Sequence, residues 1–198
     1  MNDSEIRRNF HKKMLLRHHA APQTLVLDEL GLLHGAFRAD IAVVNGKLIG
    51  YEIKSEEDSL DRLQNQIVAY DSVFDSIAII ITKRHRQAVT RRVPKHWGIV
   101  LSEKGKRGAV HFRIKRKFQQ NPYVDPVSVA RLLWKSEAIE ILKEIGAPQS
   151  LLKSQRVKLY RYLSRHLHIK KLKSAVRKCL KQRSNCRKTN SGLFMSGA

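Results

Sequence analysis

Residues 39 to 54 read ADIAVVNGKLIGYEIK, and this stretch decides the fold of the first part of the chain. The runs before and after Asn45-Gly46 are β-rich, and this dipeptide is typical of tight hairpin turns. The stretch therefore predicts an antiparallel hairpin. Because strand side chains alternate between faces, Glu52 and Lys54 should share one face of it.

The length of the hairpin loop decides whether Asp40 shares that face. A two-residue loop at Asn45-Gly46 would pair residues whose numbers sum to 91, which puts Asp40 on the face opposite to Glu52. A three-residue loop that ends in a left-handed Gly46 makes the sum 90. Asp40 then faces Gly50 and lies diagonal to Glu52, about 7–8 Å away between backbones. We predict this loop, or another irregularity of the same parity.

The sequence around the hairpin predicts a mixed α/β sheet flanked by helices. The expected elements are a helix over 4–19, strands over 24–30, 39–44 and 47–54, a helix after Ser55, a strand over 76–82, a helix over 84–93, and strands over 97–102 and 109–115. The run SIAIIIT at 76–82 is typical of a strand covered on both faces. A strand, a crossover helix and a second strand imply one parallel pair.

The character of the chain changes near residue 121. Helices are expected over 126–145, 150–167 and 170–183, the first of them capped by Asp125. No acid follows Glu144, whereas residues 151–188 carry fourteen Lys or Arg. The sequence therefore predicts a core over 1–120, a basic helical extension over 121–183 and a disordered tail over 184–198.

Composition limits the classes of function. The formal net charge is +22, which is typical of proteins that bind nucleic acid or anionic lipid. No apolar run approaches the ~20 residues that span a bilayer, and the polar N-terminus does not resemble a signal peptide. A cytoplasmic protein without a membrane segment is expected. Cys179 and Cys186 lack the spacing of a zinc site.

The acidic residues are concentrated in one part of this basic chain. Ten of the seventeen acids lie between Asp28 and Asp75. Hard divalent cations bind carboxylate oxygens, so a cation site would explain this cluster. The alternative, that the acids only solubilise helix faces, fits the acids after the hairpin better than Asp40 and Glu52. A cation and an activated water are also what phosphodiester hydrolysis requires.

Three motifs resemble those of a known superfamily. Arg38-Ala39-Asp40 followed by Glu52-Ile53-Lys54 resembles the signature of the PD-(D/E)XK nuclease superfamily, although Ala39 replaces its proline. Gln66 to Tyr70 resembles the QxxxY element of the RecB-like branch. Over roughly residues 25–102 the chain is similar to a small family of bacterial and phage proteins in that superfamily. The resemblance implies a restriction-endonuclease-like α/β core with the order αβββαβ.

The resemblance also implies a magnesium-dependent nuclease, with Mn²⁺ as a substitute metal. The implied metal ligands are Asp40, Glu52, the carbonyl of Ile53 and Glu29, which matches an additional acid that serves as a ligand or a base. Lys54 would orient or deprotonate the attacking water. Gln66 and Tyr70 would support the site and contact DNA, together with Arg38. From the residues alone, Tyr70 fits core packing better than a functional role, because it lies on the apolar stripe of the helix.

The C-terminal helices form a second predicted nucleic-acid surface. Their apolar stripes leave cationic side chains outward, where they can follow a phosphate backbone without reading sequence. The residues predicted to contact nucleic acid are Lys158, Arg161, Arg165, Lys170, Lys171 and Lys173. A membrane-surface helix is the competing interpretation, and the absence of Trp or Phe anchors in the last helix disfavours it.

Three functions remain open at this stage. The first is a magnesium-dependent nuclease acting on DNA, with RNA left open as a substrate, alone or as a homodimer. The second is a nuclease-like module that binds nucleic acid within a larger complex without cutting it. The third is a basic RNA-associated structural protein. The presence of Asp40, Glu52 and Lys54 together favours the first.

Overall fold

The computed structural model describes residues 1–193, with side chains through residue 184. The chain divides into two compact units, Met1–Val124 and Asp125–Ala198. Each unit is described by itself. Across the described part of the chain, no helix combines the length and the apolar character that crossing a bilayer requires.

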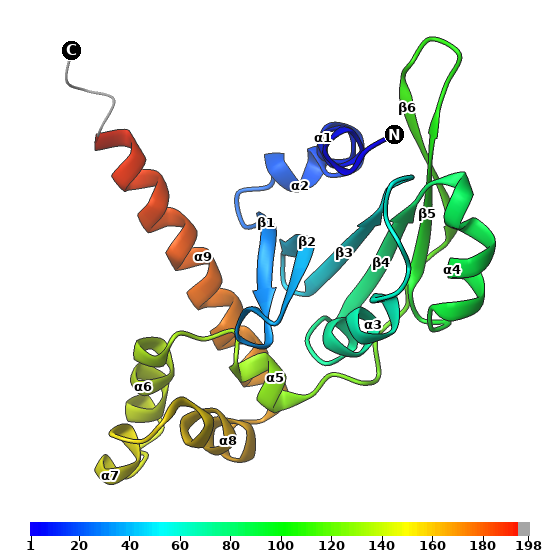
Figure 1. Ribbon diagram of the computed structural model, residues 1–198. Coiled ribbons are helices and arrows are strands. Elements are labelled where there is room, and N and C mark those ends of the chain that lie inside the picture. The colour runs from blue at the N-terminus through cyan, green and yellow to red at the C-terminus, as the bar shows by residue number, and fades with distance from the viewer. Residues whose placement is uncertain (194–198) are drawn as a thin grey trace. The chain divides into compact units, whose positions relative to one another are not determined.

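Unit 1 is built on a six-stranded mixed sheet whose strands lie side by side in chain order (Figure 1). The strands are β1 (Leu25–Leu32), β2 (Phe37–Val44), β3 (Leu48–Lys54), β4 (Ser76–Ile81), β5 (Gly98–Lys104) and β6 (Val110–Arg116). β4 runs parallel to both β3 and β5, and the other neighbouring pairs are antiparallel. The predicted α/β class, with a mixed sheet flanked by helices, is confirmed.

The helices of unit 1 are shorter than the sequence predicts. They are α1 (Asp3–Lys13), α2 (Leu16–Ala20), α3 (Leu63–Asp71) and α4 (Arg86–Arg92), with short 3₁₀ helices η1 (Leu33–Gly35) and η2 (Lys83–His85). The helix expected after Ser55 begins only at Leu63. The carboxylate of Asp58 accepts hydrogen bonds from the Ser55 N–H and hydroxyl, at 2.7 and 2.6 Å, which holds the intervening segment as a loop.

The two faces of β3 pack against different helices, α1 and α3 (Figure 1). On the α1 face, Tyr51 packs against Phe10, with ring centroids 5.1 Å apart. On the α3 face, Gly50 lies so close to Phe74 that a Cβ at Gly50 would stand 2.7 Å from the ring. Glu52 lies two residues after Gly50 and therefore points toward the α3 face as well.

The β2–β3 hairpin has the predicted parity but not the predicted pairing. Its loop comprises residues 45–47, and Gly46 has the left-handed φ of +92°. Paired residues sum to 92, so Ala42 faces Gly50. The predicted pairing of Asp40 with Gly50 is wrong because the loop begins one residue later than expected. Val44, the residue before the loop, is fully buried and remains part of β2.

Unit 2 is helical. Its helices are α5 (Pro126–Ala130), α6 (Lys135–Glu144), α7 (Gln149–Leu152), α8 (Arg156–His166) and α9 (Ile169–Leu193). The single helix predicted over 126–145 is wrong. The carboxylate of Glu137 accepts the N–H of Trp134 at 2.8 Å and caps a new helix, α6, at this point.

The single helix predicted over 150–167 is also divided, into α7 and α8. In contrast, α9 extends through residues 184–193, which were predicted to be disordered. This stretch contains no proline, and adding a residue to an existing helix costs far less than starting one. The last predicted tail residues, 194–198, lie outside the described residues.

Gly50→Ala should lower the free energy of unfolding of unit 1 by about 1–3 kcal/mol, because the added Cβ collides with Phe74. Gly31→Ala is the matched control, since its nearest contact would be 4.0 Å away. Urea unfolding followed by Trp97 fluorescence, in a Trp134→Phe background, measures both variants. Equal losses of stability would contradict the packing described above.

Candidate functional site

Acidic residues on three neighbouring strands line one cleft of about 510 Å³. Glu29 of β1 lies opposite Asp40 of β2, because the β1–β2 register is the same on both sides of this position. Continuing the β2–β3 register by one pair places Asp40 opposite Glu52 of β3. Lys54 and Gln66 also line this cleft. The structure thus brings together the residues that carry the predicted chemistry.

The carboxylate of Glu52 is 2% exposed and accepts hydrogen bonds from three side chains. Lys54 Nζ donates to Oε1 at 2.7 Å, and Gln66 Nε2 donates to the same oxygen at 2.5 Å. The Tyr70 hydroxyl donates to Oε2. Burial, and then the charges of Glu52 and Asp40, raise the pKa of Tyr70 well above its ordinary value. Tyr70 therefore stays protonated and remains a donor.

The position of Tyr70 decides between its two predicted roles. Its side chain is fully buried, so a direct contact with DNA is excluded in this conformation and that part of the prediction is wrong. Its ring packs against Trp97, with centroids 5.6 Å apart, while its hydroxyl binds Glu52. Tyr70 is thus both a core residue and a support for the carboxylate.

Asp40 is held by both backbone and side-chain groups. The Ile53 N–H donates to Oδ2 at 2.7 Å, and the Asp40 N–H donates to the Tyr70 hydroxyl at 3.3 Å. Burial, and then the negative charge of Glu52, raise the pKa of Asp40 to about 7. The Ile53 N–H and the positive charge of Arg7 oppose this shift without cancelling it. The ionised form of Asp40 is therefore disfavoured in this cleft.

Arg7 of α1 connects the acids at the rim of the cleft. Its Nη2 lies 3.1 Å from Oδ1 of Asp3, 2.8 Å from Oε1 of Glu29 and 3.1 Å from Oδ1 of Asp40. Its Nη1 donates to the backbone carbonyl of Asp40 at 2.6 Å. Burial lowers the pKa of Arg7, but the charges of the three acids outweigh burial and raise the pKa above its ordinary value. Sequence reasoning missed this residue.

Glu29 has an unusual backbone and two arginine partners. Its φ of 57° is left-handed, a conformation that residues other than glycine adopt rarely and that often accompanies functional sites. Its carboxylate pairs with Arg7 and, at 3.3 Å, with Arg38. The Arg38 side chain is 68% exposed and lies on the rim of the cleft, where it is accessible to a polyanion.

The donor set suits a cation bound by two carboxylates rather than three. Among the described residues, no group of three or more His, Cys, Asp or Glu is arranged to hold a metal ion, so the predicted set that includes Glu29 is not assembled. Mg²⁺ is often bound by one or two carboxylates, with water and substrate phosphate completing its shell. Asp40 and Glu52 fit that pattern.

Gln66 adds an observation that bears on a bound water. Its Oε1 is buried and has no hydrogen-bond partner among the described residues, while its Nε2 is bound to Glu52. A buried acceptor without a donor is costly and is usually satisfied by water or a ligand. This oxygen is therefore suited to orient a water molecule beside Glu52.

The basic residues predicted to contact nucleic acid in unit 2 lie on two helices. Lys158, Arg161 and Arg165 belong to α8, and Lys170, Lys171 and Lys173 belong to α9. Lys173 is half-buried and the other five are exposed. The apolar stripes of these helices are buried at Leu159, Leu163, Leu172, Val176 and Leu180. This leaves the exposed cations available to a polyanion.

Comparison with known proteins relates the chain to a phage protein. Over 121 residues the chain is 30% identical to Protein cII of Enterobacteria phage P4, an alignment that covers 61% of the chain and 46% of that protein. The chain thus spans about half the length of this relative. No solved structure matches the chain. Residues 2–196 match the family described as Bacteriophage P4 protein cII, and the chain belongs to that family.

Proposed function

We propose that the chain is a magnesium-dependent nuclease that hydrolyses phosphodiester bonds of DNA. The observation that carries this proposal is the convergence of Asp40, Glu52 and Lys54 in one cleft, with Gln66 bound to Glu52. The order α1, β1–β3, α3, β4 supports a restriction-endonuclease-like core. Membership of the PD-(D/E)XK superfamily is part of the same proposal.

Five residues of the cleft have a role in this proposal. Asp40 and Glu52, helped by the carbonyl of Ile53, would hold Mg²⁺, which neutralises the charge that develops on the phosphate. The Lys54 ammonium, fixed 2.7 Å from Glu52, would orient the attacking water and stabilise the negative charge that develops beside it. The unpartnered Oε1 of Gln66 would accept a hydrogen bond from that water.

A second candidate function is favoured by Arg7. Its guanidinium lies among the carboxylates of Asp3, Glu29 and Asp40, so much of their charge is balanced without a metal. A cation bound at Asp40 must therefore compete with Arg7 for that carboxylate. If Arg7 stays bound to the Asp40 carboxylate and keeps the cation out, the chain is a module that binds nucleic acid without cutting it. Cleavage assays separate the two functions.

Lys54→Met and Asp40→Asn should each slow DNA cleavage on the order of a hundredfold or more, because each removes a charge that acts on the reacting phosphate or water. Linear, circular and single-stranded DNA, incubated with Mg²⁺ or EDTA, provide the substrates. Glu57→Gln, an exposed acid on the loop after β3, is the matched control and should retain full activity.

Two results would contradict the proposed nuclease. One is cleavage that persists in EDTA or in either variant, since the proposed mechanism requires the metal and both side chains. The other is an unaltered protein that binds DNA but does not cut it with Mg²⁺ or Mn²⁺, which would establish the second function instead. Circular dichroism of each variant verifies that it is folded.

Asp40→Asn should also change how stability depends on pH. Because the folded-state pKa of about 7 lies above the ordinary value of 3.8, the folded protein retains a proton that the unfolded chain releases between these values. Its free energy of unfolding therefore falls as pH rises through this window. The variant lacks this loss. The difference between its free energy of unfolding and that of the unaltered protein should therefore rise, in favour of the variant, by about 1–3 kcal/mol from about pH 4 to about pH 8.

Urea unfolding in EDTA, repeated across this pH range, measures the effect. EDTA removes any contribution from bound metal, so that the difference reports only on protonation of the cleft. Parallel pH profiles for the two proteins would show that Asp40 ionises at its ordinary pKa.

A further inference from the structure

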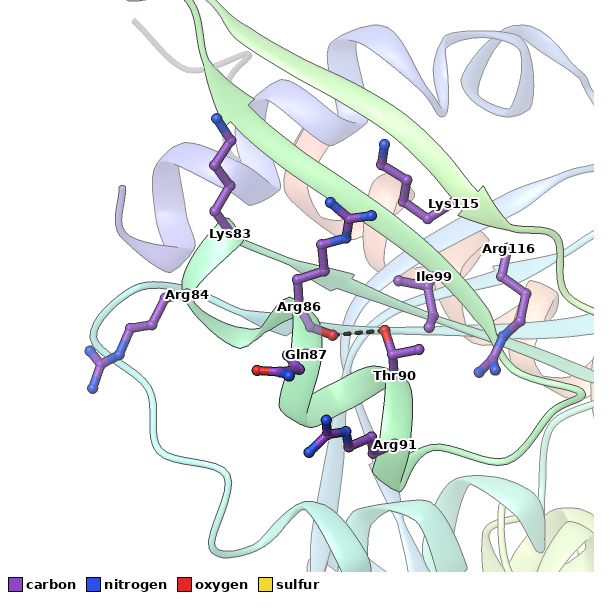
Figure 2. Close-up of a pocket in the computed structure, with 9 residues that line it drawn as sticks. All are labelled: Lys83, Arg84, Arg86, Gln87, Thr90, Arg91, Ile99, Lys115 and Arg116. Atoms are coloured by element: carbon purple, nitrogen blue, oxygen red, sulfur yellow. Dashed lines mark hydrogen bonds between the residues drawn. The ribbon is translucent and has the colours of Figure 1, made fainter.

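A second cationic surface lies in unit 1 and shares no residue with the cleft described above. It is a hollow of about 790 Å³, here named the basic hollow, formed by η2, α4, β5 and β6 (Figure 2). Six cationic side chains line it, namely Lys83, Arg84, Arg86, Arg91, Lys115 and Arg116. Gln87, Thr90 and Ile99 complete the lining.

The charge of the basic hollow is poorly balanced by the protein. Among the described residues, one carboxylate, that of Glu103, pairs with a lining cation, Lys83, at 3.1 Å. Of the six lining cations, the other five form no ion pair with a carboxylate of the described residues. Glu103 also pairs with Arg113 outside the hollow, at 3.4 Å, which reduces its effect further. Cations gathered in a concave surface focus a positive potential and favour an anionic ligand.

The lining side chains differ in how they are held. Arg116 is fixed, since its Nε donates to the carbonyl of Trp97 at 2.6 Å and its Nη2 to that of Pro94 at 2.8 Å. Arg86 and Arg91, both exposed on α4, have no side-chain hydrogen bond or ion pair within the described part of the chain. Their guanidinium groups remain available for the two-pronged hydrogen bonds that arginine makes to phosphate.

The lining also indicates which polyanion fits. No aromatic side chain lines the basic hollow, so the bases of a single strand would find no surface on which to stack. The apolar lining residue, Ile99, is buried and cannot insert into a lipid surface. Phosphate groups on a duplex, whose bases stay paired, need neither stacking nor insertion.

The basic hollow begins close to the cleft along the sheet. Lys54 pairs with Ile81 in the β3–β4 ladder, and Lys83 follows two residues later. With neighbouring strands ~4.8 Å apart and Cα steps of ~3.8 Å, the backbone of Lys83 lies within roughly 12 Å of that of Lys54. At ~3.4 Å per nucleotide, this separation corresponds to three or four nucleotides of one strand.

Hydrogen bonds from η2 also attach the basic hollow to the loop beside the cleft. The Nε2 of His85, in η2, lies 2.8 Å from the carbonyl oxygen of Ser55, the residue that follows Lys54. Arg84 in turn donates to the carbonyl of Glu56. The loop after β3 is therefore attached to the segment that starts the basic hollow.

We propose that the basic hollow binds the phosphate backbone of duplex DNA and positions it relative to the cleft. This rests on the proposed function in taking DNA as the ligand. The contacts carry no sequence information, because every free donor of the lining suits phosphate oxygens equally along the duplex. The basic hollow is thus a positioning surface and not a reader of bases.

Binding of a short fluorescent duplex to the full chain in EDTA, followed by fluorescence anisotropy across a series of salt concentrations, tests this proposal. Arg86→Ala/Arg91→Ala should bind roughly tenfold more weakly, and its slope of log affinity against log salt should be smaller by about 1.8. Arg92→Ala/Lys95→Ala removes the same charge from exposed residues next to the hollow and should bind like the unaltered protein.

Equal losses of affinity for the duplex in the two double variants would overturn the proposal, since the net charge of the protein would then explain binding without a specific surface. A larger loss for single-stranded DNA than for duplex would overturn the choice of duplex. Phosphatidylglycerol vesicles that bind the unaltered protein but not Arg86→Ala/Arg91→Ala, while duplex binds both alike, would show a lipid surface instead. Cleavage with Mg²⁺ is scored separately, so loss of hollow-dependent binding and lack of nuclease activity are distinguishable results.

Discussion

The parity of the β2–β3 register is the constraint on which the candidate site depends. The three-residue loop at 45–47 places Asp40 and Glu52 opposite each other on the face that α3 covers. A loop shorter by one residue would turn one strand over relative to the other. Glu52 would then be separated from Asp40, and the hydrogen bonds from Gln66 and Tyr70 could not form together with the one between Asp40 and Ile53. Gly46, at φ +92°, makes this loop possible without strain.

This register has an electrostatic cost, because it buries the carboxylates of Asp40 and Glu52 next to each other. The protein offsets this cost at Glu52 with the ammonium of Lys54 and two neutral donors, and at Asp40 with Arg7 and a backbone N–H. The compensation at Asp40 is incomplete, which is why its pKa rises to about 7. A proton, Arg7 and a divalent cation can each complete the balance. The proposed function requires that the cation prevails when DNA and Mg²⁺ are present.

Much of this arrangement follows from local sequence patterns. The Asn45-Gly46 turn, the alternation in the hairpin and the apolar run of β4 predict the central strands, and the parity argument anticipates that Asp40 and Glu52 share a face. Features made by distant parts of the chain are not visible in such patterns. Arg7 reaches the cleft from α1 and binds Asp40, which lies 33 residues later in the chain. His96 is buried, and its Nε2 lies 2.9 Å from Oδ1 of Asp71, 25 residues earlier in the chain. The basic hollow gathers residues of four elements and has no motif.

The central claim is that Asp40 and Glu52 form a site for a hard divalent cation. Titration with Mn²⁺, followed by the electron paramagnetic resonance signal of the free ion, tests it without requiring catalysis. The account predicts that the unaltered protein and Glu57→Gln each bind about one Mn²⁺ ion that Mg²⁺ displaces, and that Asp40→Asn loses this binding. Equal Mn²⁺ binding by the unaltered protein and Asp40→Asn, or none by either, would contradict it.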